Sequence, residues 1–311
     1  QLPDYVDFQL QARSNLLVND NGFNLPPGSS FNSISPTLND DGWVAFPVQV
    51  VTHDGDPTQS GSGVWHGRDG VGAIVHRHDD ADGISTEIAI NAAGQVAYRL
   101  GSTGNQTLWL YEPDLDAVRQ VTLLPLTPTG LSSLSLSDAG IVGYQGLVGS
   151  NRYFASTSAF PPPVDSVVHV YQSSLEPTSP YNYLYTPAMN NQRVIAGKVN
   201  VGVGSDYSKE EIRLFAADGS SHAVAWDTDI DPQSPFNSFD NSLAVNDHGQ
   251  VAVMVRLAEG SVRAVYRVAE GEEPVEIARV GGGPITEIQF FRPAINNDGL
   301  VAFRASDADG Q

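Results

Sequence analysis

Apolar residues in this chain alternate with polar ones in short runs, and turn-forming residues separate the runs. Examples are the segments 63–66 and 73–76, and later 107–110 and 118–122. Alternation over roughly four to eight residues is typical of half-buried strands. No segment keeps a period of about 3.6 residues over the length of a helix. The pattern therefore predicts an all-β protein.

One short motif returns six times along the chain. Its copies are NDDGWVAF at 39–46, NAAGQVAY at 91–98, SDAGIVGY at 137–144, NNQRVIAG at 190–197, NDHGQVAV at 246–253 and NNDGLVAF at 296–303. Successive copies start 46 to 56 residues apart. A period of this length in a chain of strands indicates a repeat architecture such as a propeller.

Each copy predicts a tight turn between two strands, at 39–42, 91–94, 137–140, 190–193, 246–249 and 296–299. Asn or Ser at the first position and Gly at the fourth favour a type I turn capped by the first side chain. Two further strand candidates follow in each unit, which makes four antiparallel strands. We therefore predict a single domain over 1–311, a six-bladed β-propeller with four antiparallel strands per blade.

The two ends of the chain complete the predicted ring. The last repeat supplies only two strands, and the chain begins with an unattached strand pair at 6–11 and 15–19. Residues 1–30 would complete the last blade and close the ring, which removes an open sheet edge. An open β-solenoid is the alternative, but its ends would need caps that the sequence lacks.

The repeated pattern Asn-x-x-Gly-x-Val-Ala-Phe resembles the tandem NxxGxxAF repeats of secreted bacterial proteins. Five of the six units match it well, and they span nearly the whole chain. The resemblance implies a repeat β fold and a secreted or periplasmic location, and it carries no reaction or catalytic residues. A chain that starts at Gln1, without an apolar leader, fits a mature exported protein.

The composition of the chain excludes several classes of binding partner and of chemical site. The 311 residues include 16 Lys and Arg against 36 Asp and Glu, a net charge of −20. Such a chain lacks the cationic footprint needed to bind nucleic acid or anionic membranes without sequence specificity. No apolar stretch is long enough for a membrane span. The absence of cysteine excludes disulfides, thiolate metal sites and cysteine nucleophiles, and no Gly-x-Ser-x-Gly or His-Glu-x-x-His motif occurs.

The longer connections between strands all fall at one end of the predicted ring, where function usually resides. They carry an arc of basic and acidic residues in the sixth, first and second blades. Its members are His53, His76, His78, Glu87, Arg99, Arg292 and Arg304. In so acidic a chain, we expect this arc to be a binding or catalytic surface.

These residue types fit a polysaccharide lyase acting on a uronate-containing glycan, as in propeller lyases with similar architecture. β-Elimination needs a base for the C5 proton, an acid for the leaving oxygen, and a cation for the substrate carboxylate. We predict His53, His76 and His78 as catalytic histidines, the first or the last as base, with Arg99 or Arg292 as neutralising cation. Glu87, Arg304, Tyr183 and Tyr185 would contact the substrate, the tyrosines as candidate acids.

Other interpretations stay open. His76 and His78 could end a strand on the solvated rim, and Arg99 and Arg304 could pair with carboxylates. The protein would then be a non-catalytic module that binds a glycan or a protein, or a structural exported repeat protein. We expect an extracellular glycan as partner and a monomeric chain.

No cofactor is predicted, and calcium is the alternative. Asp227, Asp229 and Asp231 alternate as Ca²⁺ ligands can, but the segment lacks the turn glycine and distal glutamate of an EF-hand loop.

Overall fold

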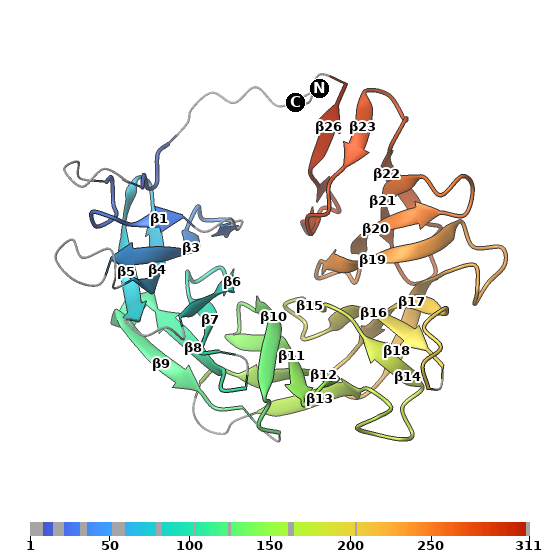
Figure 1. Ribbon diagram of the computed structural model, residues 1–311, viewed down its shortest axis with the longest axis horizontal. Helices are drawn as coiled ribbons and strands as arrows, with labels where there is room; N and C mark the ends of the chain where they lie inside the picture. Colours follow the sequence, from blue (N-terminus) through green and yellow to red (C-terminus); the bar gives the residue numbers. More distant parts are fainter. Residues whose placement is uncertain are drawn as a thin grey trace. The chain divides into compact units, whose positions relative to one another are not determined.

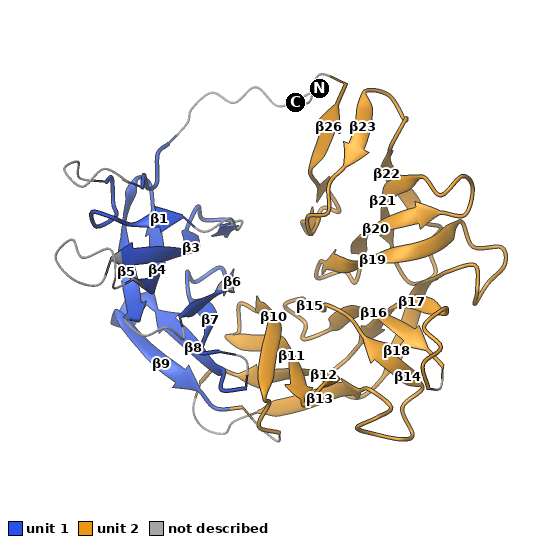
Figure 2. Cartoon of the chain, viewed as in Figure 1, with its two compact units in different colours: residues 1–122 blue, residues 123–311 orange. Residues whose placement is uncertain are grey.

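The structure is a computed structural model that describes residues 9–14, 22–31, 36–51, 60–78, 83–102, 104–123, 126–160, 165–202 and 204–308. The chain forms two compact units, residues 1–122 and 123–311 (Figure 2). The predicted segments 6–11 and 15–19 lie largely outside the described residues.

Unit 1 contains two antiparallel sheets (Figure 1). The first consists of β1 (Ser30–Phe31), β2 (Thr37–Leu38), β3 (Val44–Val51), β4 (Ser60–Arg68) and β5 (Val71–His78). The second consists of β6 (Ile84–Ile90), β7 (Val96–Leu100), β8 (Thr107–Glu112) and β9 (Ala117–Val121). We call them blades 1 and 2.

Unit 2 contains the sheets of blades 3 to 6. Blade 3 has β10 (Gly130–Leu136), β11 (Ile141–Val148), β12 (Asn151–Ser158) and β13 (Ser166–Tyr171). Blade 4 has β14 (Tyr181–Leu184), β15 (Ala188–Met189), β16 (Ile195–Val201), β17 (Glu210–Phe215) and β18 (Ser221–Trp226). Blade 5 has β19 (Phe236–Val245), β20 (Val251–Leu257), β21 (Arg263–Val268) and β22 (Val275–Arg279). Blade 6 has the pairs β23 (Ile285–Ile288) with β26 (Ala305–Asp307) and β24 (Ala294–Ile295) with β25 (Val301–Ala302).

The predicted all-β fold class is confirmed. Within the described ranges, the one helical segment is the short 3-10 turn η1 (Pro113–Leu115). The Asn-x-x-Gly turns join the first two strands of each blade, as expected. The turn glycines adopt positive φ, and Arg193, which replaces glycine in blade 4, has φ 63°.

The repeated asparagines also fasten neighbouring blades of a unit to one another. Asn39 Nδ2 donates to Asn91 O at 2.9 Å in unit 1. In unit 2, Asn190 Nδ2 donates to Asn246 O at 2.9 Å, and Asn246 Nδ2 donates to Asn296 O at 3.0 Å. The motif is therefore both a turn signal and a link between adjacent blades.

Replacing Asn246 by alanine should lower the free energy of unfolding by about 2 kcal/mol. Its side chain is 4% exposed and accepts from the amides of His248 and Gln250 while donating to the next turn. Denaturant unfolding measures the loss. Asn105→Ala is the control, because Asn105 is exposed and no side-chain hydrogen bond of it is found among the described residues. Equal stability of the two variants would contradict the link.

The described part of the N-terminal segment packs against blade 1. Asn24 Nδ2 donates to Gln11 O and Gly70 O, each at 2.7 Å. The Trp65 indole, which is fully buried, donates to Asn24 O at 2.8 Å. Completion of the last blade by residues 1–30 stays a prediction.

A buried polar network joins blades 3 and 4. His169 Nδ1 donates to Phe215 O at 3.1 Å, and its Nε2 accepts from Ser156 Oγ at 2.8 Å. Arg193 Nε donates to the same Ser156 Oγ at 2.7 Å. Burial lowers the pKa of His169 to about 4. Ser156 is 0% exposed, so this Ser–His pair stabilises the interface and offers no nucleophile to a substrate.

The network predicts acid sensitivity. Unfolded His169 would take up a proton below its ordinary pKa of 6.5, whereas folded His169 stays neutral down to about pH 4. Since the unfolded state then binds more protons, the free energy of unfolding falls as the pH drops through this window, by up to about 3 kcal/mol. Denaturant unfolding at several pH values measures the slope. In His169→Gln that part of the slope should disappear, and an unchanged slope would contradict the assignment.

Candidate functional site: cations stacked on tyrosine rings

The structure places the predicted histidines of unit 1 as follows. His53 lies outside the described residues. His76 Nδ1 lies 2.6 Å from the Tyr98 hydroxyl, between blades 1 and 2, and burial and then the charge of His78 lower its pKa. His78 follows two residues later on β5 and shares the face of His76.

Arg99 does not share the side of blade 2 that meets His76. Tyr98 and Arg99 are consecutive on β7, so their side chains leave opposite faces of the sheet. Since Tyr98 contacts His76, Arg99 leaves the other face, where it lies 3.6 Å from the Glu87 carboxylate. The Glu87–Arg99 pair is the carboxylate pairing that the alternative interpretation expects.

In unit 2 the structure gathers two predicted residues, Tyr183 and Tyr185, into a layered cluster. Their ring centroids lie 4.7 Å apart. Arg152, from the third strand of blade 3, lies over Tyr183 with its guanidinium carbon 4.1 Å from the ring centroid. Lys198, from the second strand of blade 4, lies over Tyr185 with Nζ 4.3 Å from the centroid. We call these four residues the tyrosine stack.

Each stacked cation is worth about 0.5–2 kcal/mol where water is partly excluded. The two cations differ in their other partners. Lys198 is 4% exposed and lies 2.7 Å from Glu210 Oε1, and it also donates to Phe239 O at 2.7 Å. No carboxylate of the described residues forms an ion pair with Arg152. Arg152 therefore offers an uncommitted positive charge beside an aromatic ring.

Tyr207 extends the tyrosine stack toward solvent. Its ring packs edge-on against Tyr183, with centroids 5.7 Å apart, and the residue is 47% exposed. Asn200 fixes this loop by donating from Nδ2 to Tyr207 O at 2.7 Å and Lys209 O at 3.3 Å. These bonds hold the backbone of the loop, and the Tyr207 ring itself packs against Tyr183.

Burial, and next the charge of the Glu210 carboxylate, raise the pKa of Tyr185 to about 12. The phenol therefore keeps its proton at neutral pH. It can donate a proton or a hydrogen bond, and it is a poor base.

The remaining predicted residues of unit 2 lie elsewhere. Arg304 lies over Phe291, its guanidinium carbon 4.8 Å from the ring centroid. Arg292 Nε donates to Leu243 O at 2.8 Å. Asp227 is buried, and its carboxylate accepts from the amides of Glu210 and Ile230.

The structure does not gather the alternating aspartates Asp227, Asp229 and Asp231 into a metal site. Across the described parts of the chain, no three or more His, Asp and Glu side chains lie close enough together to hold a metal ion. The calcium alternative therefore gains no support from geometry.

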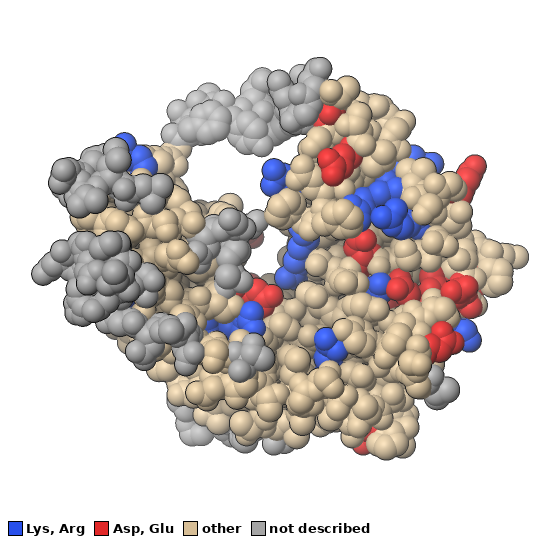
Figure 3. Space-filling view, in the orientation of Figure 1, with Lys and Arg blue, Asp and Glu red and all other residues tan. Residues whose placement is uncertain are grey.

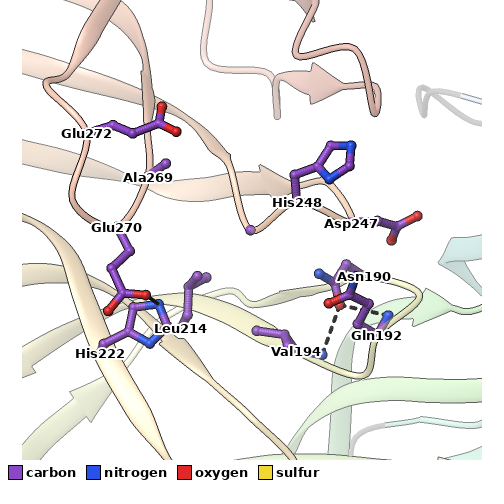
Figure 4. Close-up of a pocket in the computed structure, with 11 residues that line it drawn as sticks. Asn190, Gln192, Val194, Leu214, His222, Asp247, His248, Ala269, Glu270 and Glu272 are labelled. Atoms are coloured by element: carbon purple, nitrogen blue, oxygen red, sulfur yellow. Dashed lines mark hydrogen bonds and ion pairs between the residues drawn. The ribbon is translucent and has the colours of Figure 1, made fainter.

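A groove of about 460 Å³ opens at the turns of blades 4 and 5 (Figure 4). His222 Nε2 lies 3.2 Å from Glu270 Oε2 on one side, and Asp247 and His248 lie on the other. Glu272 adds a third carboxylate, and none of the described residues that line the groove is a Lys or an Arg. This lining repels anionic ligands, so it does not suit a uronate.

Sequence reasoning missed Arg152, Lys198, Glu210 and Tyr207 as site residues. The repeat could have identified one of these residues, Lys198. Basic residues stand eight positions after a motif asparagine in three blades, and they are Arg99, Lys198 and Arg304. In the space-filling view, Lys and Arg also gather over β20–β22 of unit 2 (Figure 3).

The sheets define a β-propeller-type protein. The model of DUF7453, a family of unknown function, matches residues 9–266, and the chain belongs to this family. No curated protein matches the chain in sequence. Among the described residues no helix is long and apolar enough to span a membrane.

Solved structures share the fold at low identity. The chain is similar to prolyl oligopeptidase B from Galerina marginata, with 10% identity, a TM-score of 0.54, and coverage of 87% of this chain and 38% of that one. It is also similar to oligogalacturonate lyase from Vibrio parahaemolyticus, with 11% identity, a TM-score of 0.52, and coverage of 78% and 67%. The chain thus spans well under half of the peptidase's length. At these identities the likeness shows the fold alone.

Proposed function

We propose that this protein binds a carboxylated glycan, such as a uronate-containing oligosaccharide, at the tyrosine stack. The observation that carries the proposal is the Arg152 guanidinium, which stacks on Tyr183 without forming an ion pair with a described carboxylate. A guanidinium binds a carboxylate through two parallel hydrogen bonds. The exposed Tyr207 ring beside it provides an apolar face for a sugar ring.

The net negative charge of the chain makes an unpaired arginine important for binding an anionic ligand. With a charge of −20, the protein as a whole repels an anionic glycan. Binding then depends on a local cation that is not already neutralised, and Arg152 meets that condition. The same proposal includes export of the protein from the cytoplasm, because such glycans occur outside the cell.

Isothermal titration with oligogalacturonate, and with the matching neutral galactose oligomer, tests the proposal. We expect the acidic ligand to bind and the neutral one to bind at least about ten-fold more weakly, since charged hydrogen bonds contribute about 1.5–3 kcal/mol. Binding should weaken as salt rises. If both ligands bind equally tightly, or if neither binds, the proposal is wrong.

A second candidate function is β-elimination of the bound uronate. The specific observation that favours it is the position of Tyr185, a protonated phenol in the tyrosine stack with the Lys198 cation over its ring. The reaction also needs a base that takes the C5 proton. The bond from C4 to the leaving oxygen then breaks, and the Tyr185 hydroxyl protonates that oxygen.

In this scheme Arg152 neutralises the substrate carboxylate in the tyrosine stack. The unsaturated product absorbs ultraviolet light, so one absorbance trace on the titrated sample separates the two functions. A rise indicates lyase activity, which Tyr185→Phe should abolish. Binding without a rise indicates a non-catalytic module.

A further inference from the structure

Blade 6 carries an exposed aromatic pair that the proposed function does not use. Phe290 is 71% exposed and Phe291 is 43% exposed. An arginine covers each ring. The guanidinium carbon of Arg263 lies 3.2 Å from the Phe290 centroid, and that of Arg304 lies 4.8 Å from the Phe291 centroid. We call Arg263, Phe290, Phe291 and Arg304 the phenylalanine stack.

Two members of the phenylalanine stack, Phe291 and Arg304, stand at the same positions of the repeat as two members of the tyrosine stack. Tyr185 and Phe291 each precede a motif asparagine by five residues. Lys198 and Arg304 each follow that asparagine by eight residues, and in both blades this cation lies over this ring.

The second cation enters each stack from the preceding blade. Arg152 stands at the start of β12 and Arg263 at the start of β21, which are the third strands of blades 3 and 5. Their target rings, Tyr183 and Phe290, differ by one position in the repeat. In both cases one cation comes from the preceding blade and the other follows the motif turn, and each of the two lies over an aromatic ring.

Each stack has one cation paired with a carboxylate, but at opposite positions: the paired cation follows the motif turn in the tyrosine stack and comes from the preceding blade in the phenylalanine stack. One cation of each is paired with a carboxylate, Lys198 with Glu210 at 2.7 Å and Arg263 with Asp240 at 3.2 Å. The other cation, Arg152 or Arg304, forms no ion pair with a carboxylate in the described part of the chain. Each stack therefore offers one uncommitted guanidinium next to an exposed aromatic surface.

Blade 2 has the cation of such a stack but lacks the aromatic residue. It has the cation Arg99 at the equivalent position, but the residue five before its motif asparagine is Thr86. Arg99 lies 3.6 Å from the carboxylate of Glu87. A cation at this position is thus not enough to build a stack.

We infer that the phenylalanine stack is a second subsite for the same class of ligand, so that the protein takes an extended glycan with repeated carboxylates. The inference rests on the proposed function of the tyrosine stack. Arginines and exposed aromatic rings are the residue types that dominate binding energy at interfaces. Two such subsites on one unit raise the affinity for a chain long enough to reach both.

A length series of galacturonate oligomers and the polymer tests the inference by isothermal titration. Short oligomers should bind the wild type at two sites, and Arg304→Ala should leave one. The polymer should bind the wild type more than about ten-fold more tightly than short oligomers, because linked subsites gain by avidity. In Arg304→Ala and in Phe290→Ala that gain should disappear. Arg267→Ala is the matched control, since Arg267 lies on β21 but contacts Gly299 at the turn end of blade 6.

The outcomes separate the two proposals. If Arg304→Ala binds short oligomers at the wild-type stoichiometry and keeps the wild-type affinity for the polymer, the second subsite is wrong while the tyrosine stack stands. If Phe290→Ala lowers the free energy of unfolding without changing glycan affinity, the rings serve packing, and the inference is overturned. If no oligomer binds the wild type, the proposed function itself fails.

Discussion

Replacing Arg152 by alanine should weaken the binding of a uronic-acid oligosaccharide by about ten- to one hundred-fold, because a hydrogen bond to a charged group contributes about 1.5–3 kcal/mol. Arg152 is stacked on Tyr183 and forms no ion pair with a described carboxylate. Its loss therefore leaves no buried charge behind, and the free energy of unfolding should fall only by the stacking contribution of about 0.5–2 kcal/mol. Isothermal titration of the variant measures the affinity, and thermal unfolding measures the stability.

Arg267→Ala provides the comparison for Arg152→Ala. Arg267 also forms no ion pair with a described carboxylate, and it lies at the turn end of its blade, where it donates to Gly299 O. It should bind the oligosaccharide like the wild type. If Arg152→Ala binds as tightly as Arg267→Ala, the tyrosine stack does not hold the carboxylate.

The second large effect concerns stability. Lys198→Met should lower the free energy of unfolding by about 3–5 kcal/mol, the range found when one partner of a buried ion pair is removed. Lys198 is 4% exposed. Without Nζ, the amide of Phe239 is the one donor to the Glu210 carboxylate found among the described residues. Denaturant unfolding measures the change.

A double variant makes this prediction specific. Lys198→Met combined with Glu210→Gln removes both charges and should recover most of the lost stability, because the neutral amide can still accept from Phe239. Lys209→Met, at an exposed lysine on the same blade, should be close to neutral. A double variant as unstable as the single one would show that Lys198 acts through packing and not through charge.

The sequence predicted the architecture well because the repeat is local. An asparagine and a glycine three residues apart specify a turn, and the alternating residues on both sides specify its strands. The structure has these turns even in blade 4, where Arg193 takes the positive φ of the missing glycine. The links from Asn190 to Asn246 and from there to Asn296 were not predictable, because they depend on how blades pack.

The candidate site was predictable only in part. Aligning the repeats identifies the column of Arg99, Lys198 and Arg304, but not which of these cations finds a ring and which a carboxylate. Arg152 could not be found this way, because it reaches Tyr183 from the preceding blade. His76 and Arg99 were predicted in one arc, yet Arg99 leaves the face of blade 2 opposite to the Tyr98 side chain that meets His76, a consequence of strand alternation.

The most direct test of the central claim is a crystal structure of the protein with a bound oligogalacturonate. We expect one sugar carboxylate about 3 Å from the guanidinium nitrogens of Arg152, at ordinary hydrogen-bond distance, and a sugar ring against Tyr207. A ligand bound in the groove beside Asp247 and Glu270, or anywhere away from the tyrosine stack, would contradict the account.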